Sequence, residues 1–187
     1  MSNKYIKAVI AGIAIALSGW MYLLAPNQII GAFLFSCGLL SVRIYGTNLF
    51  TGKIQYMVTE EYKWYDYPIF LLCNLFGVLL IAGLSRNPVQ EVVIPIAEAK
   101  LAQPFLTSFI KGIGCGALMS LATYKKSPIW MCIPCVMGFI LSGFNHCIAD
   151  FYYLSVYGHL SWSFVATILG NIVGGIMFSN LILKDEQ

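Results

Sequence analysis

A polar stretch interrupts an apolar segment in the C-terminal third of the chain: Ser142-Gly143-Phe144-Asn145-His146-Cys147-Ile148-Ala149-Asp150. Polar and ionisable groups are expensive at bilayer depth, so this stretch predicts a functional site. His146 is the first candidate, because an imidazole titrates near physiological pH and can exchange a proton with a weak acid. A glycine-containing break inside a span is also typical of midplane sites in transporters and channels.

The composition indicates that His146 lies within a membrane protein. Of the 187 residues, 59% are hydrophobic and 10% are charged, whereas a soluble domain carries about 25% charged residues. The chain therefore has too little polar surface for a soluble domain and too much apolar surface for a disordered one. The predicted class is an all-α, multi-pass membrane protein.

Apolar segments near the length of a membrane span occur six times. We expect spans at Tyr5–Leu24, Gln28–Tyr45, Pro68–Leu84, Pro104–Thr123, Ser127–Tyr157 (long and interrupted) and Trp162–Leu183. The expected connections contain prolines, among them a loop over Ser85–Gln103 with Asn87-Pro88 and Pro95. Spans and short connections use nearly the whole chain, so residues 1–187 are expected to form one transmembrane domain, with an uncleaved first span.

The distribution of basic residues predicts the orientation. With the N-terminus inside, the inner side holds most lysines, and the outer loops hold Arg86 and Lys100. This bias predicts that both termini are cytoplasmic and that the chain resides in the cell membrane.

A second polar stretch, Gly46-Thr47-Asn48-Leu49-Phe50-Thr51-Gly52, interrupts the second segment. Irregular backbone cannot face lipid, so both breaks must line a cavity or be buried in protein. The interrupted segments are the second of the first three and the second of the last three. This arrangement predicts a 3+3 inverted repeat with a site where the halves meet.

Several further residues each allow two interpretations. Phe35 and Leu39 share a helical face with Arg43, so they are either plain core or an apolar constriction. Lys100 either snorkels to lipid headgroups or presents positive charge at the mouth of an anion pathway. Arg43 needs a partner inside the membrane, and an ion pair between Arg43 and Asp150 is one hypothesis.

The cysteines leave a weaker alternative. Cys132-Ile-Pro-Cys135 has a C-x-x-C spacing that metal or redox sites use, although buried thiols commonly serve as small apolar groups. No complete ligand set has a usual zinc spacing. We therefore expect no metal or cofactor, and we retain a redox or metal site at Cys132, Cys135 and His146 only as an alternative.

Three stretches together resemble the signatures of the formate/nitrite transporter family. They are the Gly46–Gly52 stretch, Ser142–Tyr152, and Gly170-Asn171-Ile172-Val173-Gly174-Gly175, in that order along the chain. The resemblance implies six spans with broken second and fifth helices, an aquaporin-like fold, and a homopentamer with one pore in each protomer. Asn-Pro occurs only at Asn87-Pro88, so paired Asn-Pro-Ala motifs of a true aquaporin are missing.

The resemblance also implies roles for individual residues. His146 is similar to the family's central pore histidine, Thr51 to the threonine beside it, and Lys100 to a lysine that attracts anions. The implied constriction consists of Phe35, Leu39, Leu49, Phe50 and Phe139. Asn145 stands where the family often has an acid, and Gly116 where it has an asparagine.

The expected function is passage of formate, nitrite or hydrosulfide, with a proton added near His146. An apolar constriction disfavours a bare charge, so a neutral acid would cross it more readily. The partners expected are small anions, protons, lipid and further copies of the chain, without nucleic acid. No nucleophile–base constellation occurs, so we expect no enzyme. An aquaporin-like channel for neutral solutes is the main alternative.

Overall fold

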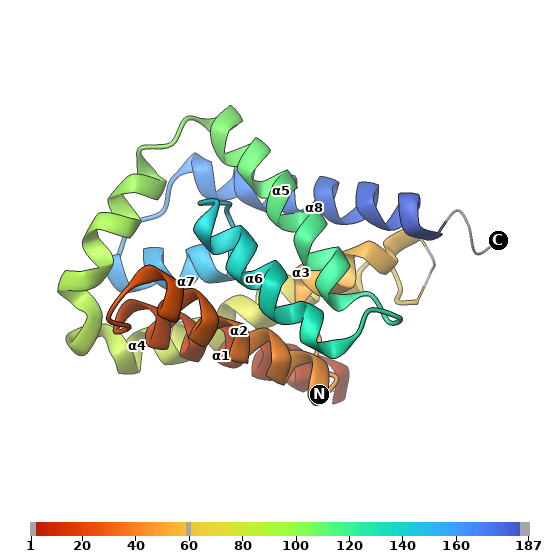
Figure 1. The fold of residues 1–187 in the computed structure, drawn as a ribbon, viewed down its shortest axis with the longest axis horizontal. Helices are drawn as coiled ribbons and strands as arrows, with labels where there is room; N and C mark the ends of the chain where they lie inside the picture. Colours follow the sequence, from red (N-terminus) through yellow and green to blue (C-terminus); the bar gives the residue numbers. More distant parts are fainter. Residues whose placement is uncertain (1–2, 59–60, 184–187) are drawn as a thin grey trace.

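The computed structural model describes residues 3–58 and 61–183, and all regular structure in these ranges is helical. The chain forms α1 (Asn3–Leu23), α2 (Gln28–Ile44), α3 (Phe50–Lys53), the 3₁₀ helix η1 (Ile54–Val58), α4 (Asp66–Leu101), α5 (Phe105–Thr123), the 3₁₀ helix η2 (Ile129–Met131), α6 (Cys132–Leu141), α7 (Cys147–Tyr157) and α8 (Trp162–Leu183). Figure 1 shows these helices crossing one another in one bundle.

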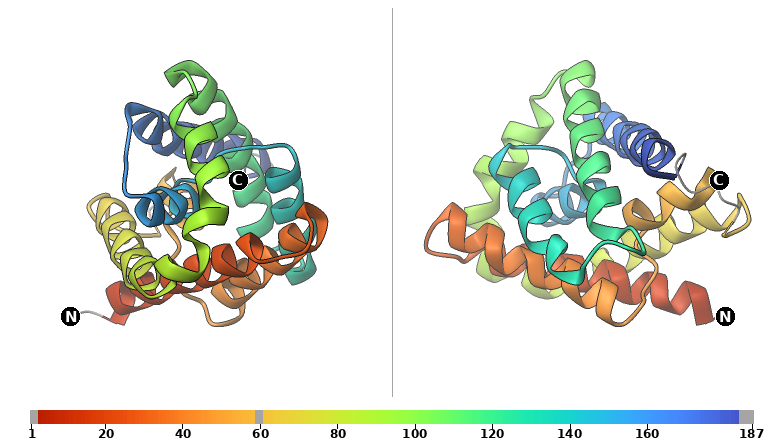
Figure 2. Two further views of the ribbon diagram at one scale, coloured as in Figure 1. Left: turned by 90° about the vertical axis from the view of Figure 1, so that its left-hand side faces the viewer. Right: turned by 45° about the vertical axis from the view of Figure 1, so that its right-hand side comes forward.

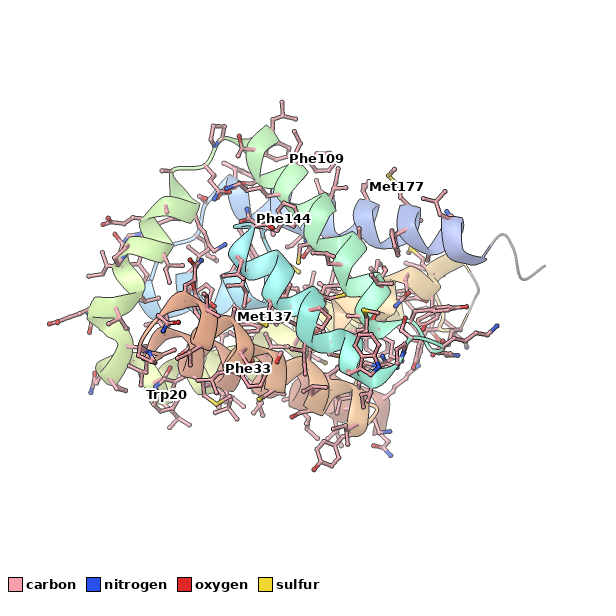
Figure 3. All side chains as sticks on the ribbon, viewed as in Figure 1. Trp20, Phe33, Phe109, Met137, Phe144 and Met177 are labelled. Carbon is pink, nitrogen blue, oxygen red and sulfur yellow. The ribbon has the colours of Figure 1, made fainter. Side chains whose placement is uncertain are left out.

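Four helices within the described ranges are long and apolar enough to cross a membrane: α1, α4, α5 and α8. Many of the side chains that face outward are apolar. Met177 of α8 and Phe33 of the shorter α2 are examples, and both are at least half-exposed (Figure 3). The buried core is apolar as well. An apolar exterior over an apolar core is the pattern expected of a bundle immersed in lipid.

The predicted loop over Ser85–Gln103 is wrong, because α4 continues through it to Leu101. Pro88 and Pro95 lie inside the helix, where each removes one backbone N–H and clashes with the preceding turn. Such prolines kink a helix when its flanks still favour helix, and Figure 1 shows the second part of α4 turning away from the first. Because α4 continues to Leu101, Lys100 lies in its last helical turn rather than in a loop.

The two polar stretches separate short helices from the helices before them. The chain leaves α2 after Ile44 and resumes as α3 at Phe50; it leaves α6 after Leu141 and resumes as α7 at Cys147. Gly46 and Gly143 have φ of 57° and 65° at the two exits, a left-handed conformation that glycine adopts without strain. Figure 2 shows α7 enclosed by longer helices, and nearly all of its residues are buried.

One asparagine, Asn74 of α4, holds the first break. Its Oδ1 accepts the backbone N–H of Phe50 at 2.7 Å, where α3 begins. Its Nδ2 donates to the carbonyls of Asn48 at 3.0 Å and of Ala8 in α1 at 2.6 Å. The amide thus satisfies backbone groups that the break would leave unpaired inside the bundle.

Asn171 of α8 holds the second break in the same way. Its Oδ1 accepts the backbone N–H of Cys147 at 2.9 Å, where α7 begins. Its Nδ2 donates to the carbonyls of Asn145 at 2.8 Å and of Gly112 in α5 at 2.9 Å. Each anchoring helix also lies very close to its partner: a Cβ on Gly12 would lie 2.1 Å from the carbonyl oxygen of Asn74, and one on Gly116 2.4 Å from that of Asn171.

Candidate functional site

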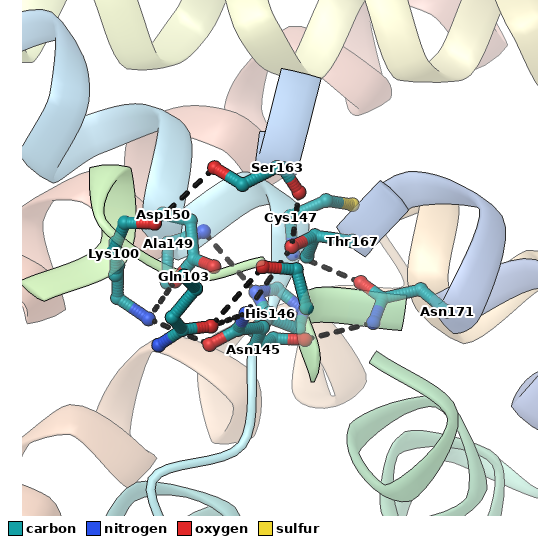
Figure 4. Close-up of polar contacts among 11 residues, drawn as sticks. Lys100, Gln103, Asn145, His146, Cys147, Ala149, Asp150, Ser163, Thr167 and Asn171 are labelled. Carbon is teal, nitrogen blue, oxygen red and sulfur yellow. Dashed lines mark hydrogen bonds and ion pairs between the residues drawn. The ribbon is translucent and has the colours of Figure 1, made fainter. Parts of the chain in front are cut away.

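His146 lies between the two short helices. It is the N-cap of α7, and its Nδ1 accepts the backbone N–H of Ala149 at 3.2 Å (Figure 4). Its Nε2 lies 2.8 Å from Oγ1 of Thr51 in α3. The ring is 2% exposed. A buried imidazole with both nitrogens in hydrogen bonds has a fixed orientation.

These two hydrogen bonds determine which nitrogen of the His146 ring carries the proton. Because a backbone N–H is a donor, Nδ1 must offer a lone pair to Ala149. The neutral ring then carries its proton on Nε2 and donates it to the Thr51 hydroxyl. That hydroxyl keeps its own proton for a further acceptor.

Aromatic rings cover the histidine on one side. The Phe139 ring is stacked on the His146 ring with centroids 5.6 Å apart and planes 19° apart. Phe35 meets Phe139 edge to face at 5.9 Å. The other predicted constriction residues, Leu39, Leu49 and Phe50, are also buried in the core. An ion passing His146 would therefore meet apolar surface.

A cavity of about 370 Å³ opens next to Phe139. We name it the Lys100 vestibule; its lining includes Lys100, Gln103, Lys111, Phe139, Asp150 and Tyr153. The Lys100 ammonium forms an ion pair with Asp150 Oδ1 at 2.6 Å. It also donates to Asn145 Oδ1 at 3.1 Å.

The Asn145 side chain is held by residues of two helices, α4 and α8, and of the connection between α4 and α5. Its Oδ1 accepts from Lys100, and its Nδ2 donates to Gln103 Oε1 at 2.8 Å and to Thr167 Oγ1 at 3.3 Å (Figure 4). A carboxylate has no N–H to donate to the Gln103 carbonyl oxygen. The surroundings of residue 145 therefore match an amide, and the acidic side chain beside Lys100 is Asp150, one helical turn beyond His146.

A second cavity of about 240 Å³ lies at the other break. We name it the Arg43 vestibule; its lining includes Arg43, Thr47, Lys53, Tyr56, Thr123 and Lys125. Arg43 donates to the carbonyls of Ala122 at 2.8 Å and Ser127 at 3.0 Å. The predicted Arg43–Asp150 ion pair is wrong, since the two residues line different vestibules and Asp150 pairs with Lys100.

Glu61 sits beside the Arg43 vestibule and contacts two of its lysines. Its carboxylate oxygens lie 3.6 Å from Lys53 Nζ and 2.9 Å from Lys125 Nζ. Partial burial opposes ionisation of this carboxyl group, but the two lysines outweigh it and hold the pKa of Glu61 below its ordinary value. Glu61 is therefore ionised at neutral pH.

The alternative of a metal site at the cysteines has no support in the described part of the chain. There, no group of three or more His, Cys, Asp and Glu residues is placed to hold a metal ion. The Cys132 thiol instead lies 3.7 Å from the Ala122 carbonyl oxygen, as a weak donor. Both nitrogens of His146 are already in hydrogen bonds.

Sequence reasoning missed several residues of the site. Gln103 and Thr167 orient Asn145, and Asn74 and Asn171 hold the breaks. The two asparagines were detectable in principle, because each is an amide within an apolar span, where side-chain amides mark interhelical hydrogen bonds.

Comparison with known proteins assigns the chain to a family. The sequence profile described as formate/nitrite transporter matches residues 1–184. The formate channel BtFdhC of Bacillus thuringiensis is 27% identical over 189 residues, covering 81% of this chain and 70% of that protein. The nitrite transporter NirC of Salmonella typhimurium is 30% identical over 182 residues, covering 79% of this chain and 66% of that protein.

Solved structures agree on the fold. A pentameric formate channel with formate bound superposes with a TM-score of 0.83 at 21% identity, covering 98% of this chain and 96% of that one. An ion channel of the same family superposes with a TM-score of 0.84 at 22% identity, covering 99% and 90%. The all-helical fold, the apolar exterior and the full-length match lead to one conclusion: this chain belongs to the formate/nitrite transporter family of multi-pass membrane transporters and channels.

Proposed function

We propose that this chain is a channel for small monovalent anions of weak acids, such as formate, nitrite or hydrosulfide. The observation that carries the proposal is the position of His146. This buried, hydrogen-bonded imidazole stands behind an aromatic constriction next to a vestibule that holds two lysines. Both a formate channel and a nitrite transporter are among the relatives.

In this mechanism the vestibule first concentrates the anion. Positive charge in a concave site with low-dielectric walls raises the local anion concentration. The bare anion then meets Phe35 and Phe139, and a charge in such surroundings costs several kcal/mol or more. Adding a proton removes most of this barrier, so the acid crosses as a neutral molecule.

We infer that vestibule water supplies this proton, with His146 assisting as a neutral donor. Giving up the Nε2 proton would leave the ring an anion, because Nδ1 is engaged with the Ala149 N–H. The Thr51 hydroxyl accepts from His146 and turns its own proton toward the permeating molecule. His146 and Thr51 together stabilise the anion while it takes a proton from a vestibule water, and a proton from the external solution restores that water.

The proposal includes the architecture of the channel. Residues 1–187 form one transmembrane domain of two inverted three-span halves, with broken second and fifth spans. The matching bonds of Asn74 and Asn171 support this symmetry. By kinship with the pentameric channel, the chain assembles as a homopentamer in the cell membrane, and the lysine distribution places both termini in the cytoplasm.

Flux into proteoliposomes tests the proposal. Uptake of formate, nitrite, lactate and hydrosulfide is compared across a pH series for wild type, His146→Ala and Lys100→Ala. We expect anion uptake that rises as the external pH falls and drops in both variants. Unchanged uptake in both variants would reject the mechanism. Glycerol or urea swelling without anion flux would instead support a neutral-solute channel.

A further inference from the structure

The Lys100 vestibule contains two lysines in different electrostatic situations. Lys100 forms a close ion pair with the buried Asp150, so the two charges largely cancel toward the cavity. Lys111 lines the same cavity, and within residues 3–58 and 61–183 no ion pair includes it. The vestibule therefore has one balanced pair and one lysine without a carboxylate in contact.

The position of Lys111 keeps its charge near the path. It lies in α5, six residues from the start of the helix at Phe105, and it is half-buried. Its backbone carbonyl accepts the N–H of Asn145 at 3.3 Å, which fixes α5 against the residue preceding His146. Its ammonium lies next to Gly143, where a Cβ added to the glycine would be 3.9 Å from Nζ.

A lysine inside a span needs an anion, carbonyl oxygens or water. The carbonyl end of α6, which finishes at Leu141 just before Gly143, offers Lys111 the negative end of a helix dipole. An ammonium in the lining of the cavity can direct its N–H donors toward a molecule there. Such donors suit a small carboxylate or nitrite.

We propose that Lys111 is an anion-binding residue of the Lys100 vestibule and supplies its net positive charge, while Asp150 neutralises Lys100. The ligand class is a small monovalent oxyanion, for which formate is the probe. This inference rests on the proposed function, because it names the residue that draws the anion toward the constriction. It assigns to Lys111 the attraction that the family resemblance assigns to Lys100.

The test introduces a negative charge beside Lys111 and keeps the lysine in place. Gly143→Asp places a carboxylate near the ammonium, and Gly143→Asn has the same shape without the charge. Asn and Asp tolerate positive φ better than other side chains, so the backbone strain is matched. Lys111→Gln and Lys111→Arg form a second pair, and Arg86→Gln removes an exposed positive charge of α4 outside the vestibule lining.

Two quantities are measured for each variant: initial formate flux against formate concentration, at low and high salt, and formate binding to the purified protein by broadening of its carbon-13 NMR line. Gly143→Asp and Lys111→Gln should raise the half-saturating and binding concentrations roughly tenfold at low salt, the lower range of electrostatic focusing. High salt should shrink the difference. Gly143→Asn, Lys111→Arg and Arg86→Gln should stay near wild type.

The outcomes separate this proposal from the proposed function. Binding that weakens in both charge-altering variants supports the Lys111 site even if no variant or wild type conducts formate, a result that would reject the channel. The Lys111 site would be overturned if formate flux and binding were equal in Gly143→Asp and Gly143→Asn and if Lys111→Gln behaved like wild type. Equal effects of Arg86→Gln and Lys111→Gln would also overturn it, since general surface charge would then explain them.

Discussion

The Lys100–Asp150 pair makes a prediction at the scale of single residues. The Lys100 and Asp150 side chains are 15% and 5% exposed, so removing one leaves the other charge buried without its counter-ion. Breaking a buried pair costs about 3–5 kcal/mol, whereas replacing both partners is often neutral. We expect Lys100→Gln to lower thermal stability in detergent and Lys100→Gln with Asp150→Asn to recover most of it.

The double variant also has a functional readout. If the pair is balanced toward the vestibule, removing both charges leaves formate attraction close to wild type. A double variant that is as unstable as Lys100→Gln would contradict the pairing. Thermal unfolding of wild type, Lys100→Gln, Asp150→Asn and the double variant measures the coupling between the two side chains.

The His146–Thr51 bond gives a second residue-scale prediction. Thr51→Val keeps the volume but leaves the Nε2–H of His146 without its acceptor, and an unsatisfied buried donor costs about 1–3 kcal/mol. We expect Thr51→Val to lose stability and formate flux, and Thr51→Ser to keep both. Equal behaviour of the two variants in unfolding and flux assays would show that the hydroxyl contributes nothing.

At the scale of helices, the hydrogen bonds of Asn74 and Asn171 explain how the irregular backbone before α3 and α7 stays ordered inside an apolar bundle. Asn171→Ala removes hydrogen bonds to Cys147, Asn145 and Gly112 at once. Each buried group left unpaired costs about 1–3 kcal/mol, so we expect severe loss of folded protein. Asn180→Ala, an exposed position of the same helix, is the matched control, and monodisperse protein after size-exclusion chromatography is the measurement.

Gly116 of α5 lies where the structure has no room for a side chain. A Cβ there would lie 2.4 Å from the Asn171 carbonyl oxygen, so the backbone of α8 occupies the space of a side chain. We expect Gly116→Ala, and still more Gly116→Asn, to be destabilised because α5 and α8 must separate. Gly138→Ala, whose added methyl would meet its nearest neighbour at 3.7 Å, should unfold at nearly the wild-type temperature in the same thermal assay.

The Glu61 contacts predict a pH dependence. The folded pKa of Glu61 is lowered, so its stabilising contribution is complete above the unfolded pKa, about 4.3, and is lost as pH falls through the folded value. We expect Glu61→Gln to be less stable than wild type at pH 7 and equal to it at the acid end. Melting temperatures measured from pH 7 downward check this, and a difference between the two proteins that does not shrink as the pH falls would exclude the ion pairs as its cause.

The fold could be predicted where local signals are strong. Apolar segments located α1, α2, α5 and α8 closely, and the two polar stretches begin where α2 and α6 end. The extent of α4 could not be predicted, because Pro88 and Pro95 indicate a turn by local rules and only the packed helix shows them as kinks. The ion pair of Asp150 with Lys100 joins residues far apart in the sequence, and no local pattern predicts it.

The sequence suggests individual residues for the candidate site, and their roles stay predictions, whereas the contacts between them come only from the structure. His146 and Thr51 come from separate halves, and the structure places them 2.8 Å apart. The bonds of Gln103 and Thr167 to Asn145 depend on the bend of α4 and the approach of α8, so no local pattern indicates them.

At the scale of the molecule, the chain contains both vestibules, the Phe35–Phe139 ring pair and His146. A pentamer of the kind seen in the related formate channel would then contain independent pathways, and its exposed apolar helices would face either lipid or neighbouring copies. Assembly and conduction should therefore be separable.

Mixed pentamers test this independence. His146→Phe keeps an aromatic ring but removes the ring nitrogens, so we expect it to assemble without conducting. Co-expressing it with wild type in varied ratios, and confirming the mass of the solubilised complex, should give formate flux proportional to the wild-type fraction. A steep loss of flux at small variant fractions would mean that subunits share one pathway, because a single silent copy would then close the whole complex.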